Sequence, residues 1–114
     1  MQRAERWLKQ VGSPIARLDT PVALVDLDAV ARNNAKLAAM CSEARVTWRA
    51  HAKTHKSAFF ALQQIKAGAV GVCVQKTGEA EALFAGGVQD IFISNEVIAE
   101  AKLERVAWLA SRCK

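Results

Sequence analysis

The stretch VTWRAHAKTHK, residues 46–56, decides the fold of this 114-residue chain. Apolar and polar side chains alternate through residues 46–53, and a period of two predicts a strand with two different faces. The polar face carries three nitrogen-rich side chains in succession, Arg49, His51 and Lys53. Because no acidic residue within the stretch neutralises them, this face is suited to an anionic or electron-rich partner.

Three strand–helix repeats begin with this strand. Short apolar runs predict further strands over 70–75 and 90–94, the first of them buried on both faces. Helices are expected after each strand: over 58–66, from the N-cap Thr77 to Gly86, and from the N-cap Asn95 onward. Strand ends about twenty residues apart are typical of βα units with short loops and parallel strands.

Two further segments precede the repeats. Residues 1–20 are expected to be an N-terminal arm. Residues 21–45 would hold a strand over 21–26 and a helix over 29–42, with Asp28 as its N-cap. This strand and helix stand outside the repeating pattern.

The basic face of the first strand favours a barrel over an open sandwich. In a sandwich a helix would bury Arg49 and His51, which is costly without partners. In a barrel the apolar face meets the helices, and Lys53 lies at the carboxyl end of its strand, where (β/α)8 enzymes keep their catalytic groups. A full barrel has eight strands and about 250 residues. We therefore expect an α/β fold in which residues 46–114 form the first three βα units of a truncated, TIM-like (β/α)8 barrel.

Composition argues against several classes of protein. The net charge is +5, but the basic residues are spread along the chain rather than interleaved with aromatic ones, as nucleic-acid binding would require. No apolar run reaches the roughly 18 residues of a membrane span, and the N-terminus lacks a secretory signal, so a cytoplasmic protein is expected. Three separated cysteines and two histidines predict neither a disulfide framework nor an enclosed metal site.

The amine at position 53 suggests covalent chemistry. Beside Arg49 and His51, the neutral and nucleophilic form of Lys53 is favoured, and it can form a Schiff base with an aldolase-type substrate or with pyridoxal phosphate. The alternative is that Lys53 is an ordinary exposed residue of a polar loop. His55 lies in the turn, where it is expected to be solvated. Three polar side chains near the later strand ends could line the pocket or serve only in loops and caps: Gln75, Lys76 and Asn95.

Four segments of the chain together resemble one enzyme family. They are TPVALVDLDAV at 20–30, RAHAKTHK at 49–56, GAVGVCVQKTGEAEAL at 68–83 and ISNEV at 93–97. The family is the D-threonine aldolase and D-serine dehydratase group, fold-type III pyridoxal-phosphate enzymes whose N-terminal domain is like that of alanine racemase. The resemblance implies that Lys53 is the catalytic residue and holds pyridoxal 5′-phosphate as a Schiff base. The further cofactor-binding residues expected are Arg49, His51 and Gln75.

The resemblance also implies an activity. It predicts a lyase acting on D-β-hydroxy amino acids, first of all a D-threonine aldolase-like retro-aldol cleavage to glycine and an aldehyde. A D-serine dehydratase-like lyase and a non-catalytic barrel fragment are the alternatives. The expected partner is a small D-amino acid rather than a nucleic acid or a membrane, and a homodimer or pairing through exposed sheet edges is left open.

Two departures from the family pattern matter. The proline that precedes the histidine of the lysine motif is Ala50 here, which should keep the strand. The family's phosphate-binding loops and divalent-metal ligands lie further along than residue 114, as does the β-domain expected to pair with residues 21–26. The family therefore implies a divalent metal whose ligands are absent from this chain.

Overall fold

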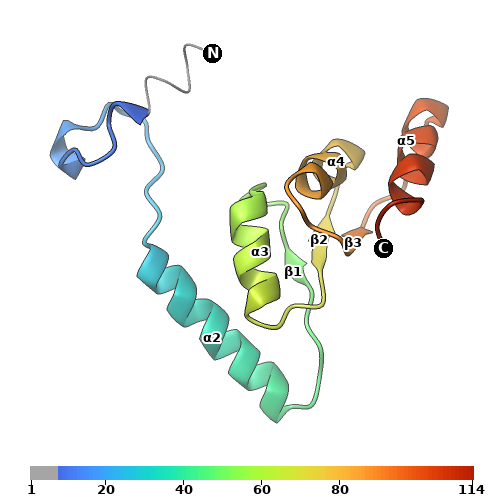
Figure 1. Cartoon of the computed structure of the whole chain (residues 1–114), viewed down its shortest axis with the longest axis horizontal. Helices are drawn as coiled ribbons and strands as arrows, with labels where there is room; N and C mark the ends of the chain where they lie inside the picture. Colours follow the sequence, from blue (N-terminus) through green and yellow to red (C-terminus); the bar gives the residue numbers. More distant parts are fainter. Residues whose placement is uncertain (1–7) are drawn as a thin grey trace.

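The computed structural model describes residues 8–114, so the first seven residues of the predicted arm lie outside it. Its centre is a parallel three-stranded sheet in the order β1-β2-β3, formed by Ala50–His51, Val72–Val74 and Ile91–Ile93. Figure 1 shows the helix that follows each strand: α3 (Ala58–Lys66), α4 (Thr77–Ala85) and α5 (Glu100–Ala110). The predicted α/β class with parallel strands is confirmed.

One face of the sheet packs against the helices. The register aligns Ala50 with Val72 and Val72 with Ile91, so these side chains point the same way. Val72 and Val74 are fully buried, as the apolar run over 70–75 predicts. Removing this apolar surface from water is the main force that holds helices to sheet. The buried cluster comprises Ala52, Ala61, Val72, Val74, Ala80, Leu83, Val88 and Leu109.

The opposite face of the sheet is more open. It carries His51, Cys73 and Phe92, which are neighbours in the register. Phe92 is 55% exposed and His51 is also exposed, whereas Cys73 is buried. The two unlike faces expected from the alternation in the first strand are therefore present.

Two predicted strands differ from the structure. The strand expected over 46–53 pairs as β1 at only two positions, although the Trp48 carbonyl and the Ala52 N–H still bond to the segment around β2 at 3.0 and 2.8 Å. Residues 21–26 form no strand. A strand needs a neighbour for its backbone groups, and no segment of residues 8–114 pairs with 21–26.

The first predicted N-cap is corrected by the structure. The helix α2 (Leu27–Glu43) begins before the predicted residue 29 because the Asp26 carboxylate, not that of Asp28, accepts the Ala29 N–H at 2.9 Å. The helix predicted over 58–66 has the observed bounds of α3.

The two later N-caps are also corrected. Thr77 is the first residue of α4, and Lys76 holds the N-cap position. α5 has Ala99 rather than Asn95 at its N-cap. The chain stays irregular after β3 until Glu100, and Asn95 and Val97 in this irregular segment line a cavity.

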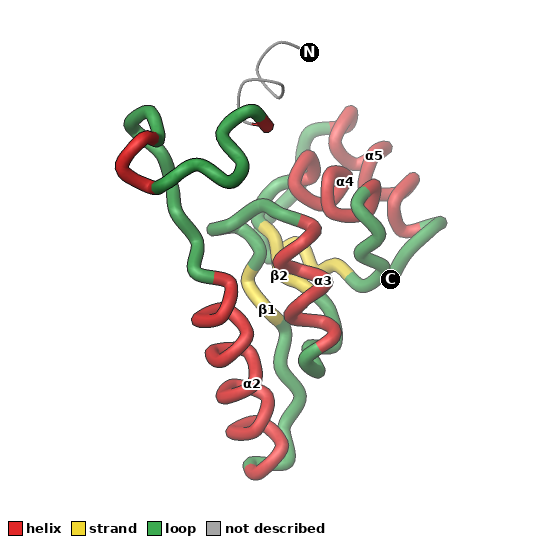
Figure 2. The backbone as a smooth tube through the Cα atoms, turned by 60° about the vertical axis from the view of Figure 1, so that its left-hand side comes forward, coloured by secondary structure: helices red, strands yellow, loops and turns green. Residues whose placement is uncertain are grey.

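The N-terminal part of the described chain lies apart from the sheet. Figures 1 and 2 show α2 beside α3, with the short 3-10 helix η1 (Ile15–Arg17) further out. No residue of α2 is buried, and Leu37 and Met40 on it are exposed. The helices found within residues 8–114 are too short or too polar to cross a bilayer.

The chain returns to the sheet after α5. The Lys114 N–H donates to the Gln89 carbonyl at 2.9 Å, and the Ile91 N–H donates to the Lys114 carbonyl at 2.7 Å. This is the bonding pattern of a parallel neighbour to β3. Lys114 therefore lies on the edge of β3 that β2 leaves free, and continues the order β1-β2-β3.

Candidate active site

Lys53 lies just beyond the carboxyl end of β1, where the sequence places it. Its side chain is exposed and has no hydrogen-bond or ion-pair partner among residues 8–114. The turn that carries it is closed by the Lys56 N–H, which donates to the Ala52 carbonyl at 2.8 Å. The Lys53 side chain is therefore accessible to solvent at the carboxyl end of β1.

Arg49 lies at the opposite, amino end of the sheet. Its guanidinium forms an ion pair with Asp90, with Nη1 2.6 Å from Oδ1, and donates to the Val72 and Asp90 carbonyls at 3.3 and 3.4 Å. The Arg49 hydrogen bond and charge hold the pKa of Asp90 below its usual value, against the opposing effect of burial. The structure thus joins Arg49 to β3 rather than to Lys53, and its cofactor contact stays a prediction.

Gly71 leaves the room that the Arg49 side chain needs to reach Asp90. A Cβ at Gly71 would lie 2.9 Å from the Asp90 Cβ, and closer still to the Asp90 carbonyl oxygen and to Nη1 of Arg49. Only a residue without a side chain lets the guanidinium pass over the start of β2. Sequence reasoning missed Asp90 as a partner, although an acidic residue directly before a strand was a usable signal.

His55 is not the solvated turn residue that the sequence suggested. Its Nδ1 accepts the Ser57 N–H at 3.1 Å, and its Nε2 lies 3.3 Å from Oε1 of Gln64. The ring also meets Phe60 edge-on, with centroids 5.7 Å apart. Ser57 makes no side-chain cap bond to α3, but its own N–H is satisfied by His55.

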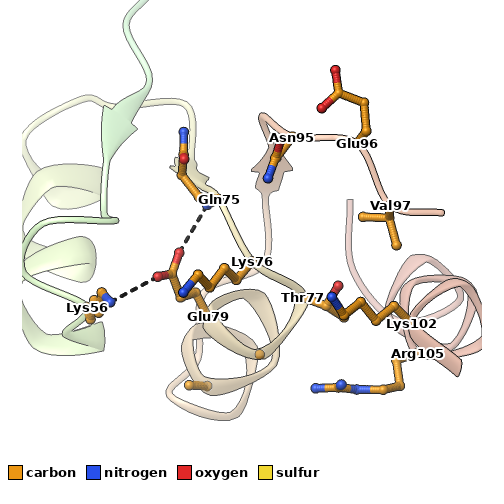
Figure 3. A pocket seen from close by; sticks show the side chains of 12 residues that line it. Lys56, Gln75, Lys76, Thr77, Glu79, Asn95, Glu96, Val97, Lys102 and Arg105 are labelled. Atoms are coloured by element: carbon orange, nitrogen blue, oxygen red, sulfur yellow. Dashed lines mark hydrogen bonds and ion pairs between the residues drawn. The ribbon is translucent and has the colours of Figure 1, made fainter. Parts of the chain in front are cut away.

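A cavity of about 700 Å³ opens beside the carboxyl ends of β2 and β3 (Figure 3). Gln75, Lys76 and Asn95 all line this cavity, and a pocket that they share with Lys53 stays a prediction. Lys53, His51 and Arg49 are not among its lining residues. The predicted residues therefore fall into two groups, one along β1 and one around this cavity. Charged residues also line the cavity: Lys56, Glu79, Glu96, Lys102 and Arg105.

Glu79 joins the turn after β1, through Lys56, to the end of β2. Figure 3 shows its carboxylate between two partners: Oε2 accepts the Gln75 N–H at 3.0 Å, and Oε1 lies 3.2 Å from Nζ of Lys56. The Gln75 hydrogen bond, helped by Lys56, holds the pKa of Glu79 below its usual value although burial opposes it. The sequence indicates a favourable place for Glu79 at a helix start but not these partners.

The Gln75 side chain faces the next strand. Its Nε2 lies 3.5 Å from the Ser94 hydroxyl, which donates to the Val74 carbonyl at 3.1 Å. Among residues 8–114, no three histidine, cysteine or carboxylate side chains are grouped to hold a metal ion. The functional groups at the carboxyl end of the sheet are therefore the Lys53 amine, the His51 imidazole and the Gln75 and Asn95 amides.

Comparison with known proteins gives these features a context. No family model matches the chain. D-threonine aldolase from Arthrobacter sp is 44% identical over 105 residues, which are 92% of this chain and 28% of that enzyme. 3-hydroxy-D-aspartate aldolase from Paracoccus denitrificans is 40% identical over 99 residues, or 86% of this chain and 26% of that enzyme. D-threo-3-hydroxyaspartate dehydratase from Delftia sp. strain HT23 is 45% identical over 74 residues, 65% of this chain and 20% of the dehydratase.

Solved structures agree with the sequence matches. D-threonine aldolase from Filomicrobium marinum superposes with a TM-score of 0.85 and 44% identity, covering 88% of this chain and 27% of that one. The Delftia dehydratase gives a TM-score of 0.75 and 38% identity over 83% of this chain and 25% of its own. A mutant of that dehydratase has also been solved in a metal-free form. The chain thus spans between a quarter and a third of the D-threonine aldolases that it matches.

Proposed function

We propose that this chain, a homologue of one part of the D-threonine aldolase and hydroxyaspartate lyase group, belongs to a pyridoxal-phosphate-dependent lyase. The substrates would be D-β-hydroxy amino acids. The observation that carries the proposal is the 44% identity to D-threonine aldolase over 92% of the chain. The chemical feature that supports it is an exposed lysine at the carboxyl end of a parallel strand, with no partner within residues 8–114.

The residues present suit the aldehyde of this cofactor. Lys53 offers an amine that no carboxylate of residues 8–114 occupies, and His51 lies two residues earlier, on the open face of the sheet. Pyridoxal phosphate, when bound, withdraws electrons from the α-carbon of an amino acid. Lys53 would hold the cofactor, and Gln75 would reach the same region from the end of β2. Arg49 would act on the cofactor only at a distance, because Asp90 engages its guanidinium.

Two reactions are compatible with this arrangement. In the aldolase version the β-hydroxyl would lose its proton, the Cα–Cβ bond would break to release an aldehyde, and the α-carbon would take up a proton to give glycine. In the dehydratase version Lys53 would remove the α-proton, and the β-hydroxyl would leave. The aldolase is preferred because the two D-threonine aldolases are 44% identical over 92% and 88% of the chain, whereas the dehydratase structure is 38% identical over 83% of it. We assign no step to a metal, because the side chains described do not form a ligand group.

The fold is proposed to be part of a (β/α)8 barrel. The parallel order β1-β2-β3 and the pairing of Lys114 beside β3 support continued winding in one direction. In this proposal residues 46–114 are barrel units, and residues 21–26 pair with a further domain. The outer edge of β1 has no neighbour within residues 8–114. We therefore also propose that a second chain pairs with this edge.

The test is titration of the chain with pyridoxal 5′-phosphate. We expect the visible absorbance band of a lysine-bound cofactor, and its loss in Lys53→Ala. Lys36→Ala, which removes an exposed lysine on α2, is the matched control and should keep the band. A band that persists in Lys53→Ala would reject the assignment. Assays with D-threonine and D-serine, each with a divalent metal added, then distinguish the aldolase, the dehydratase and a non-catalytic chain.

A further inference from the structure

The lysine motif contains two amines within one turn. Lys53 and Lys56 are three residues apart, and both side chains are exposed. Either amine could react with an aldehyde that reaches the carboxyl end of the sheet. The structure separates them by their partners: Lys53 has none among residues 8–114, whereas Nζ of Lys56 lies 3.2 Å from Oε1 of Glu79.

The Glu79 carboxylate is held firmly in place. Its side chain is only 11% exposed, and Oε2 accepts the Gln75 N–H at 3.0 Å. That hydrogen bond keeps the pKa of Glu79 low although burial opposes it, so the group is ionised at neutral pH. Glu79 therefore presents a fixed negative charge to the turn.

The backbone fixes which of the two lysines meets this charge. Lys56 has φ of 50°, a left-handed conformation that closes the turn, and its N–H donates to the Ala52 carbonyl at 2.8 Å. Figure 3 shows the Lys56 side chain directed at Glu79, at the start of α4. Lys53 begins the same turn and makes no such contact.

We propose that Glu79 is a specificity-determining residue, which holds the Lys56 ammonium in an ion pair and so directs an aldehyde to Lys53. An amine attacks a carbonyl only through the lone pair of its neutral form. An ion pair with a carboxylate requires the ammonium, which has no lone pair to donate. The inference rests on the proposed function for the identity of the aldehyde, and adds a reason why one lysine of the motif reacts.

The experiment traps the bond on the whole 114-residue chain. Pyridoxal 5′-phosphate is added and the adduct is reduced with borohydride. The lysine nitrogen bonds to the aldehyde carbon, water leaves, and borohydride donates hydride to that carbon, so that a stable secondary amine remains. Mass spectrometry of peptides then gives the ratio of label on Lys53 to label on Lys56. We expect Lys53 to dominate in the unmodified sequence.

Glu79→Gln is the variant that tests the ion pair. Glutamine keeps an oxygen for the Gln75 N–H but loses the charge opposite Lys56. Losing the ion pair should lower the ratio of label on Lys53 to label on Lys56. Because an ion pair with an exposed partner contributes little free energy, the fall should be only about twofold to fivefold. Glu81→Gln is the matched control: it removes the ion pair of α4 with Arg105 on α5, and should leave the ratio unchanged.

Added salt provides a second measurement without mutation. Salt screens exposed charges, so the ratio in the unmodified chain should fall as the salt concentration rises from about 0.01 to 1 M. Equal labelling of Lys53 and Lys56 at low salt, or a ratio unchanged in Glu79→Gln, would overturn the inference. If Lys53 dominates and the ratio falls in Glu79→Gln, but the unreduced chain shows no absorbance band of a lysine-bound cofactor, the ion-pair inference holds and the proposed function fails.

Discussion

Replacing Gly71 by alanine should destabilise the sheet. The new methyl group would lie 2.9 Å from the Asp90 Cβ and closer to the Asp90 carbonyl oxygen. The Arg49 side chain can swing away, but that carbonyl cannot, because it also accepts the Val72 N–H at 3.0 Å. The methyl therefore forces β3 away from β2 and breaks the Arg49–Asp90 ion pair.

The expected loss follows from these two effects. Overpacking by one methyl group costs about 1–3 kcal/mol. A partly exposed ion pair adds up to ~1 kcal/mol. The Arg49 and Asp90 side chains are 29% and 23% exposed, so the larger share comes from the steric effect. A loss of about 2 kcal/mol lowers the urea midpoint by roughly 1 M when the denaturant slope is ~2 kcal/mol/M.

Urea unfolding followed by tryptophan fluorescence measures this loss, and the chain has three tryptophans. Gly78→Ala is the matched control. Its Cβ would meet only Nη2 of Arg105, at 3.7 Å, and alanine within a helix is favoured over glycine by about 0.5–1 kcal/mol. We expect Gly78→Ala to unfold at the same or a higher urea concentration. An unchanged midpoint for Gly71→Ala would refute the argument that Gly71 provides the passage for Arg49.

Two further predictions concern the core and the acid limit. Leu83 lies in the core and is 2% exposed, so Leu83→Ala should lower the free energy of unfolding, measured in urea, by about 2–5 kcal/mol. Leu103 is 47% exposed, and Leu103→Ala should lower it by under ~1 kcal/mol. Equal losses would contradict the assigned core. Asp90 has a lowered pKa in the folded state, so its contribution is complete above the usual carboxyl value near ~4 and is lost as the pH falls through the folded value. Asp90→Asn should therefore flatten the decline of stability in acid, and an unchanged acid profile would show that the Arg49 pair does not contribute.

Local patterns in the sequence predicted much of the architecture. The alternation around His51 indicated two unlike strand faces, and the apolar run VGVCVQ at 70–75 indicated a buried strand. The helix over 58–66 was predicted with its observed bounds. These features depend on side-chain periodicity within one element, which is visible without knowledge of the fold.

Strand lengths and caps were less predictable. The strand expected over 46–53 pairs at only two positions, and residues 21–26 have no neighbour within the described chain. Pairing depends on a partner segment, which local pattern does not reveal. The Asn95 cap was also wrong, since the segment after β3 stays irregular until α5 begins at Glu100.

The sequence by itself determined the order of strands and helices, and it placed Lys53 at the end of the first strand. Only the tertiary structure decided which charges meet: Arg49 with Asp90, and Lys56 with Glu79. Lysine and arginine carry the same charge in any local pattern, so their partners depend on how the parallel strands align. That alignment pairs Lys56 with Glu79 and leaves Lys53 without a partner in the described part of the chain, residues 8–114.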